Sequence, residues 1–282
     1  MKLCVFTTSG AVAVLDGPAQ KTVAVANVRD PSFETRFLVV EGTHAYLGLI
    51  SRAVAIDLAA LRLSADVSSD SAFVCGALFG GEVVVGGMGG VRKLDATLKE
   101  RSGWRVAAPT AFSVFGDRLF AAANDGRVVA CQGSDTKDAT LTPRDRSASV
   151  TAIEASRAPL VYTGTMRGRV AIYSGSRDAS EPKEISTGES RILALAPAAD
   201  DAVLAACADG FVRQVWKDGR VEKREHWAVG FSAAIAEGGG FLLGDPEGGV
   251  LTYSAKDGYT KIAEATPDLG GIAALARIGA TP

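Results

Sequence analysis

A unit of about 40 residues recurs seven times along the chain. Each copy contains an apolar run, a turn with Gly or Pro, a second apolar run, a turn bearing Gly, and an alternating third run. The clearest copy has these runs at 150–153, 160–164 and 170–173. The second turn of each copy carries the periodic residue, which is Gly10, Gly89, Gly126, Gly168, Gly210 or Gly248, with Ser51 and Arg52 filling the remaining place.

Four short strands per unit at this spacing are typical of the blades of a β-propeller. We therefore predict an all-β, seven-bladed β-propeller with four-stranded antiparallel blades, whose strands we name A to D from the axis outward. The A strands are expected at 37–40, 73–78, 110–114, 150–153, 192–195, 231–235 and 272–275. The D strands are weak and polar, as at 220–227, which suits an exposed outer edge.

The two ends of the chain complement each other. Residues 271–278 have the pattern of a strand A, whereas residues 3–28 supply strands B, C and D. We expect the C-terminal strand to join the N-terminal blade and so to close the ring of a single domain. Blade 1 then comprises 271–282 with 1–29, and blades 2 to 7 comprise approximately 36–70, 71–108, 109–147, 148–189, 190–229 and 230–269.

The order of these elements resembles the WD40 repeat family across essentially the whole chain. The segment 168–173, Gly-Arg-Val-Ala-Ile-Tyr, is similar to the family's Asp-Gly-x-Val-x-Ile-Trp segment, and acidic residues end the third run at Asp16, Asp57 and Asp95. No Trp-Asp or Gly-His pair occurs, so the family's Asp-His-Ser/Thr-Trp hydrogen-bond network is not carried over. The resemblance implies a propeller whose loops on one face bind peptides.

The composition of the chain limits the classes of partner and the cellular compartment that we expect. Thirty basic and 32 acidic residues leave a formal charge of −2, and no long basic run occurs, so we expect no direct nucleic-acid binding. The apolar window 71–91 is interrupted by Glu82 and by glycines, which argues against a membrane span. The N-terminal residues lack the pattern of a signal peptide.

The four cysteines, Cys4, Cys75, Cys131 and Cys207, have no metal-binding spacing, and we expect them to be small buried residues. Together with the missing leader pattern, they indicate a reducing compartment, the cytoplasm or the nucleus.

Residues suited to catalysis or metal binding are sparse. His44 and His226 are the only histidines, and they fall in different blades. Glu41, Glu154 and Glu237 lie near the ends of A strands, where we expect ordinary turn residues. We therefore predict no catalytic residue, no metal site and no cofactor.

The favoured function is a non-catalytic scaffold for protein–protein interactions, a monomeric ring within a larger complex. Arginine and methionine are enriched at the centres of interfaces, so a protein or peptide partner carrying acidic residues is expected. The predicted binding residues lie at the B to C turns and just before A strands; they are Arg36, Arg52, Met88, Asn124, Arg167, Arg191 and Asp209.

Two alternatives stay open. The first is an enzyme, or a propeller that binds a small molecule or an ion, with its site in the central channel. The second is an architectural subunit that binds through its outer edges, for which the charged segment 217–226 is a candidate.

Overall fold

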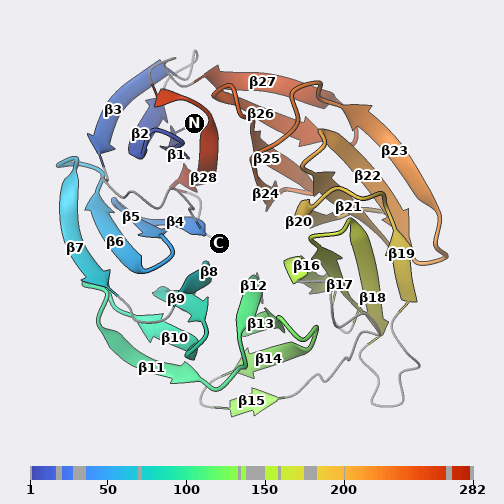
Figure 1. The fold of residues 1–282 in the computed structure, drawn as a ribbon, viewed down its shortest axis with the longest axis horizontal. Helices are drawn as coiled ribbons and strands as arrows, with labels where there is room; N and C mark the ends of the chain where they lie inside the picture. The colour runs from blue at the N-terminus through green and yellow to red at the C-terminus, as the bar shows by residue number, and fades with distance from the viewer. Residues whose placement is uncertain are drawn as a thin grey trace.

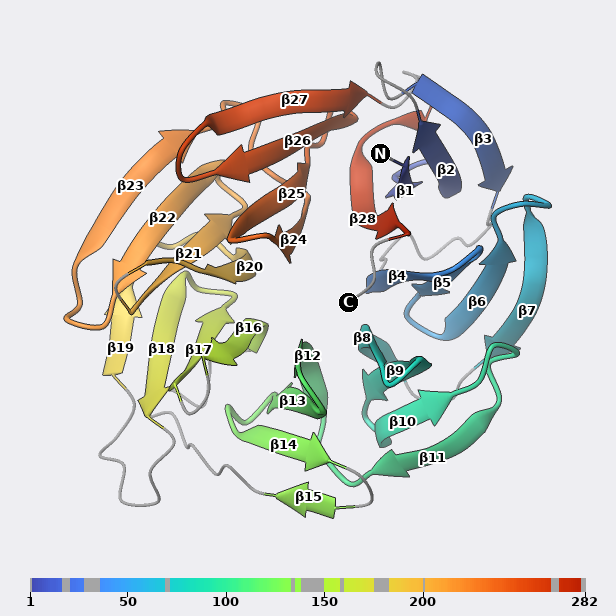
Figure 2. The ribbon, with the colours of Figure 1, turned by 180° about the vertical axis from the view of Figure 1, so that it is seen from behind.

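The computed structural model describes residues 2–16, 21–27, 36–68, 72–132, 135–137, 150–157, 160–174, 183–199, 201–264 and 269–279. These residues form seven four-stranded antiparallel sheets arranged around a central axis (Figure 1). Each sheet is one blade of a β-propeller, which confirms the predicted fold. The view from behind in Figure 2 shows the same ring, with the outermost strands on its circumference.

The innermost, A strands are β28 (Ile272–Ile278), β4 (Phe37–Glu41), β8 (Phe73–Phe79), β12 (Pro109–Phe115), β16 (Val150–Arg157), β20 (Ile192–Pro197) and β24 (Ala233–Glu237). The B strands are β1 (Lys2–Thr7), β5 (His44–Gly48), β9 (Glu82–Gly87), β13 (Arg118–Ala123), β17 (Leu160–Thr165), β21 (Ala202–Cys207) and β25 (Gly240–Gly244).

The C strands are β2 (Ala11–Asp16), β6 (Arg52–Asp57), β10 (Gly90–Leu94), β14 (Val128–Gln132), β18 (Arg169–Ser174), β22 (Phe211–Trp216) and β26 (Gly249–Ser254). The D strands are β3 (Lys21–Asn27), β7 (Arg62–Ser68), β11 (Glu100–Trp104), β15 (Asp135–Lys137), β19 (Lys183–Ser186), β23 (Val221–His226) and β27 (Gly258–Glu264). Within the described parts of the chain, no helix is both long and apolar enough to cross a bilayer.

The hydrophobic core is divided among the contacts between neighbouring blades. Seven buried clusters are present, and each combines residues of two adjacent blades. Because successive side chains of a strand point to opposite faces, Leu3 and Val5 of β1 pack on blade 7, whereas Cys4 and Phe6 pack on blade 2. Both faces of a blade are therefore buried, which explains why B strands such as β1, β13 and β21 are buried at nearly every position instead of at every second one.

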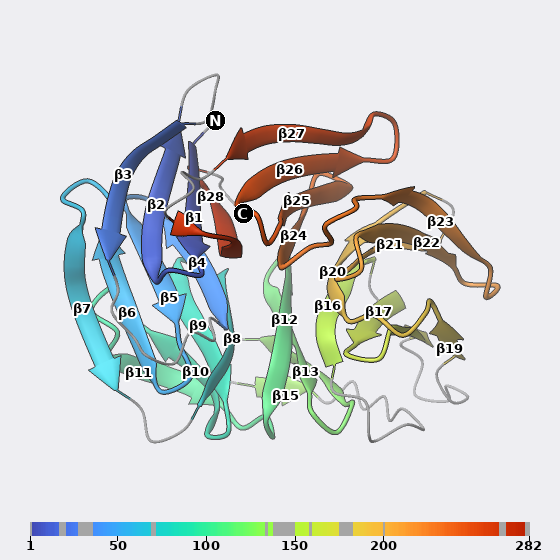
Figure 3. The ribbon, with the colours of Figure 1, turned by 45° about the horizontal axis from the view of Figure 1, so that its top comes forward.

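The ring is closed by pairing between the two ends of the fold. Strand β28 lies antiparallel to β1, with a register that runs from Lys2 opposite Ile278 to Thr7 opposite Ile272. Figure 3 shows β28 beside β1, with β2 and β3 following outward in the same blade. The prediction that a C-terminal strand completes the N-terminal blade is confirmed.

A five-residue turn joins strands B and C in five of the seven blades. Its fourth residue is Gly10, Gly126, Gly168, Gly210 or Gly248, with φ between 68° and 95°. The amide of each glycine donates to the carbonyl of the first turn residue, with N···O distances of 2.9–3.3 Å. A Cβ on Gly210 would lie 2.0 Å from the carbonyl oxygen of Trp227, so only glycine fits there.

Blades 2 and 3 have shorter B to C turns. In blade 3 the residue with positive φ is Gly90, at 106°, and not the periodic Gly89 that the repeat selects. The difference arises because Gly87 pairs directly with Gly90 across the turn, which leaves only two residues between the strands.

The closing strand should be indispensable for folding. We expect deletion of residues 271–282 to abolish cooperative unfolding and soluble expression. Strand β1 loses its inner neighbour, the cluster between blades 1 and 7 loses Ile272 and Leu275, and the cluster between blades 1 and 2 loses Ala276. Thermal unfolding followed by circular dichroism, together with size-exclusion chromatography, measures this effect.

Leu275→Ala is the matched control, because it keeps the backbone pairing and removes only a side chain that is 2% exposed. It should cost about 2–5 kcal/mol and leave a folded protein. A truncated chain that melts cooperatively near the full-length temperature would contradict the role of β28.

Candidate functional site

One face of the ring is formed by the B to C turns and by the loops that lead from strand D into the next strand A. We call this surface the BC face and the opposite surface the AB face. All seven predicted binding residues lie on the BC face: Arg36 and Arg191 precede A strands, and Arg52, Met88, Asn124, Arg167 and Asp209 lie at B to C turns. The topology of the blades therefore brings together residues that are far apart in the sequence.

Two of these residues form ion pairs within their own blades. The Arg52 guanidinium donates to Asp66 from Nε at 2.7 Å and from Nη2 at 2.5 Å. Asp209 accepts two hydrogen bonds from Arg213, at 2.8 Å and 2.6 Å. A partner would have to compete with these contacts.

The main chains of three further predicted residues fix the loops of this face. The amide of Arg36 donates to Gly48 at 2.9 Å, and the amide of Asn124 donates to Ala108 at 2.9 Å. The carbonyl of Arg191 accepts from the amide of Ala208 at 2.9 Å. These bonds tie the loops that enter β4, β12 and β20 to the B to C ends of their own blades and restrict the movement of those loops.

Three exposed apolar side chains lie on loops of the BC face. Met88 is 78% exposed at the turn between β9 and β10, Met166 is 52% exposed between β17 and β18, and Val229 is 39% exposed between β23 and β24. Leu63, on an outer strand, and Phe115, at the AB face, are the other large apolar residues exposed in the described part of the chain. Three of the five therefore share one surface.

Met88 and Arg167 were predicted from the sequence as binding residues, whereas Met166 and Val229 were not. The signal for Met166 was present, since it directly precedes Arg167 in a turn equivalent to that of Met88. The exposure of Val229 could not be predicted from the sequence. Two residues earlier, Trp227 packs partly into the cluster between blades 6 and 7, and nothing in the sequence shows that Val229 points away from that cluster. Arg167 is exposed, and no other described residue forms a hydrogen bond or ion pair with its side chain.

The Asp209–Arg213 pair stabilises blade 6 beneath this face. Arg213 is only 4% exposed, whereas the carboxylate of Asp209 is 35% exposed. Burial raises the pKa of Asp209, but hydrogen bonds from Arg213 and from the amide of Phe211 outweigh burial and hold this pKa below its usual value. The amide of Asp209 also donates to Ser190 Oγ at 2.9 Å, which connects the pair to the loop from blade 5.

Arg92 occupies the equivalent position in blade 3. It pairs with Val85 across its sheet, as Arg213 pairs with Ala205 in blade 6. The Cζ atom of Arg92 lies 5.2 Å from the centre of the Phe73 ring, but its Nε and Nη2 atoms are buried without a hydrogen-bond partner. Blade 3 has Met88 four residues before this arginine, where blade 6 has Asp209.

The carboxylates near the axis are held by the protein itself. Glu237, at the end of β24, forms an ion pair with Arg277 of β28 at 2.7 Å. Glu154 is buried, and its Oε1 accepts a hydrogen bond from the amide of Ser156 at 2.6 Å. Across the described ranges, no group of three or more His, Cys, Asp or Glu residues is arranged to hold a metal ion.

The four cysteines are buried in the blades, and His226 packs against a neighbouring ring. All four cysteines are free and buried, as predicted. Burial raises the pKa of Cys4 to about 12 and the pKa of Cys207 to about 11, so these thiols stay protonated and weakly nucleophilic at neutral pH. His226 stacks on Phe211 with ring centroids 4.3 Å apart.

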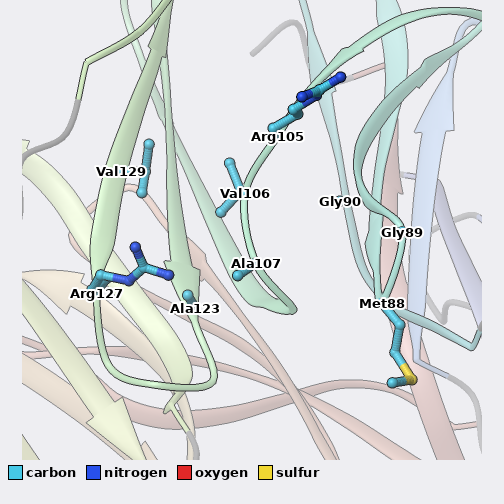
Figure 4. A pocket seen from close by; sticks show the side chains of 9 residues that line it. All are labelled: Met88, Gly89, Gly90, Arg105, Val106, Ala107, Ala123, Arg127 and Val129. Atoms are coloured by element: carbon cyan, nitrogen blue, oxygen red, sulfur yellow. The ribbon is translucent and has the colours of Figure 1, made fainter.

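A groove opens on the BC face between blades 3 and 4 (Figure 4). Its volume is about 330 Å³, and its lining includes Met88, Arg105, Val106, Arg127 and Val129. The sequence analysis included only Met88 of these residues. Arg105 and Val106 belong to the loop after β11, and Arg127 directly precedes β14, so the groove forms only when two blades lie side by side.

Comparisons with known proteins establish the class of fold and nothing finer. No protein-family model matches the chain, and no curated protein matches it in sequence. Among solved structures, 1421 chains are similar to it. The crystal structure of the computationally designed Ika8 protein has a TM-score of 0.67 and 16% identity, over 98% of this chain and 87% of that chain. At this identity, the likeness shows the propeller fold alone.

The Asp209–Arg213 pair should respond asymmetrically to substitution. Asp209→Ala leaves the buried Arg213 charge without a partner and should lower the free energy of unfolding by about 3 kcal/mol. Arg213→Met leaves a carboxylate that water can solvate and should cost only about 1 kcal/mol. Urea unfolding measures both values, and the double variant should resemble Arg213→Met. Equal losses in the two single variants would contradict this account.

The contribution of the same pair to stability should fall at acid pH. Because the folded-state pKa of Asp209 is lowered, its contribution is complete above the unfolded-state pKa of about 3.9 and is lost as pH falls through the folded-state value. The difference in free energy of unfolding between the wild type and Asp209→Asn should therefore be constant near neutral pH and shrink below about pH 4. Urea titrations over this range test the expectation, and a difference that grows on acidification would refute it.

Proposed function

We propose that this chain is a WD40-like propeller that acts as a non-catalytic scaffold and binds a protein or peptide partner on its BC face. The observation that carries the proposal is that Met88, Met166 and Val229, three of the five exposed large apolar residues in the described part of the chain, all lie on that face. Methionine is enriched at the centres of interfaces. The ring would act as one subunit of a larger complex.

Charge on the BC face supports an acidic partner. Arg105 and Arg167 are exposed there, and Arg127 adds a further guanidinium at the groove between blades 3 and 4. Arginine combines a planar cation with an apolar stem, so it contacts acidic and apolar groups of the same ligand. A peptide that carries both acidic and apolar side chains fits this surface best.

The proposed compartment is reducing, the cytoplasm or the nucleus. Four free cysteines lie inside the blades, and Cys4, Cys131 and Cys207 belong to different clusters between blades. Proteins that keep several unpaired thiols are typical of compartments in which disulfides do not form.

Binding should depend on the apolar residues of the BC face. In the triple variant Met88→Ser, Met166→Ser and Val229→Ser, we expect the principal partner to be lost while the melting temperature changes little, because exposed residues contribute about 0.5 kcal/mol or less to stability. Quantitative pulldown from the native source with mass spectrometry, comparing wild type and variant, measures the loss.

The double variant Leu63→Ser and Phe115→Ser is the matched control. It removes two apolar residues, 42% and 46% exposed, from the outer edge and the AB face, and it should retain the partner. Loss of the partner in this control, with retention in the triple variant, would instead favour an architectural subunit that binds through those surfaces.

A further inference from the structure

The groove between blades 3 and 4 combines apolar walls with a positive charge. Val106 and Val129 approach it from opposite sides, and Ala107 and Ala123 leave space between them (Figure 4). None of its nine lining residues, all of them in the described part of the chain, is acidic, whereas two are arginines. A volume of about 330 Å³ accommodates side chains of a bound peptide.

Arg127 is held in an orientation that leaves its terminal nitrogens available. Its Nε donates to Asp125 Oδ2 at 2.7 Å, and its amide donates to Asp125 Oδ1 at 3.1 Å. No described residue accepts a hydrogen bond from either terminal nitrogen. Figure 4 shows the guanidinium directed from its strand toward Ala107, across the groove. Two terminal nitrogens held in a fixed orientation can donate hydrogen bonds to the two oxygens of a carboxylate.

The rim of the groove adds two further features. Arg105 is exposed at one end, where its side chain points away from Arg127 (Figure 4). Met88 is exposed at the other end. A peptide lying across the groove would meet the terminal nitrogens of Arg127 within it, the charge of Arg105 at one end and a flexible apolar side chain at the other. Charge complementarity therefore favours an acidic residue in the groove and an apolar neighbour on Met88.

We propose that the groove between blades 3 and 4 binds a glutamate or aspartate side chain of a peptide segment through Arg127, with the adjacent apolar residue of that peptide packed on Met88. The inference rests on the proposed function and refines it by assigning the partner's chemistry to one place on the BC face. Blade 6 offers an internal precedent for this recognition, since Asp209 there binds Arg213 through two hydrogen bonds.

Selection of random peptides displayed on phage, with the intact protein as bait, tests the proposal. Enriched peptides should share an acidic residue beside an apolar one, and the synthetic form of the strongest peptide should bind more weakly at high salt. Arg127→Met should weaken that peptide roughly tenfold to a hundredfold, as expected for lost hydrogen bonds to a charged group. Fluorescence anisotropy measures the affinity.

Two further variants make the test specific. Ala107→Glu places a carboxylate on an exposed groove residue beside Arg127 and should block the peptide without loss of stability. Arg118→Met removes an exposed arginine from the AB end of the same blade and should leave the affinity unchanged. Thermal unfolding of each variant verifies that the ring is intact.

The outcomes separate this inference from the proposed function. Enriched peptides that lack acidic residues, or that bind Arg127→Met as tightly as the wild type, would overturn the groove assignment. If such peptides still require Met166 and Val229, the BC face remains the binding surface. If no peptide is enriched, or if binding ignores every substitution on this face, both proposals fail.

Discussion

Burial of both faces of every blade is the constraint on which this structure depends. A β-sheet of four short strands has too little apolar surface to be stable alone, and here each sheet is covered on either side by its neighbours. Neighbouring clusters share no residue, yet every blade contributes to two of them, so the ring is stable only as a whole. This arrangement also explains where polar groups can lie. Exposed polar groups concentrate at the turns, the loops and the outer strands, whereas a charge within a blade, such as Arg213, needs a partner there.

The BC face is rigid because its turns and loops bind each other. The positive φ of Gly168 and Gly210 brings the passing chain so close that a Cβ would collide with its carbonyl oxygens. The amide of Trp227 donates to Gly210, and the amide of Thr187 donates to Gly168, which fixes the loops beside the turns. Side chains such as Met166 are therefore displayed from a preorganised backbone. A partner would lose little free energy in ordering this surface on binding.

The fold could be predicted from the sequence because the residue pattern that produces one blade is repeated seven times. Periodic glycines, apolar runs and a strand A pattern at 272–275 all reflect local geometry that one sequence displays directly. The site could be predicted only in part. The periodicity placed Arg167 and Met88 on one face, but it could not show that Asp209 is bound by Arg213, because that contact depends on side-chain conformations under the turn. It also could not reveal the groove, since Val106 and Val129 meet only where two blades pack together.

Pairing of β28 with β1 has a consequence for how the chain folds during synthesis. The strand that completes the first blade is made after all the others, so Leu3 and Val5 lack one wall of their cluster until about 270 residues have been translated. At ribosomal speeds that delay is on the order of tens of seconds. During this time the nascent chain exposes the unpaired inner edge of β1 at one end of an open arc and an uncovered face of blade 7 at the other. Such an intermediate is a natural substrate for chaperones, and the need for them should end abruptly when the last strand emerges.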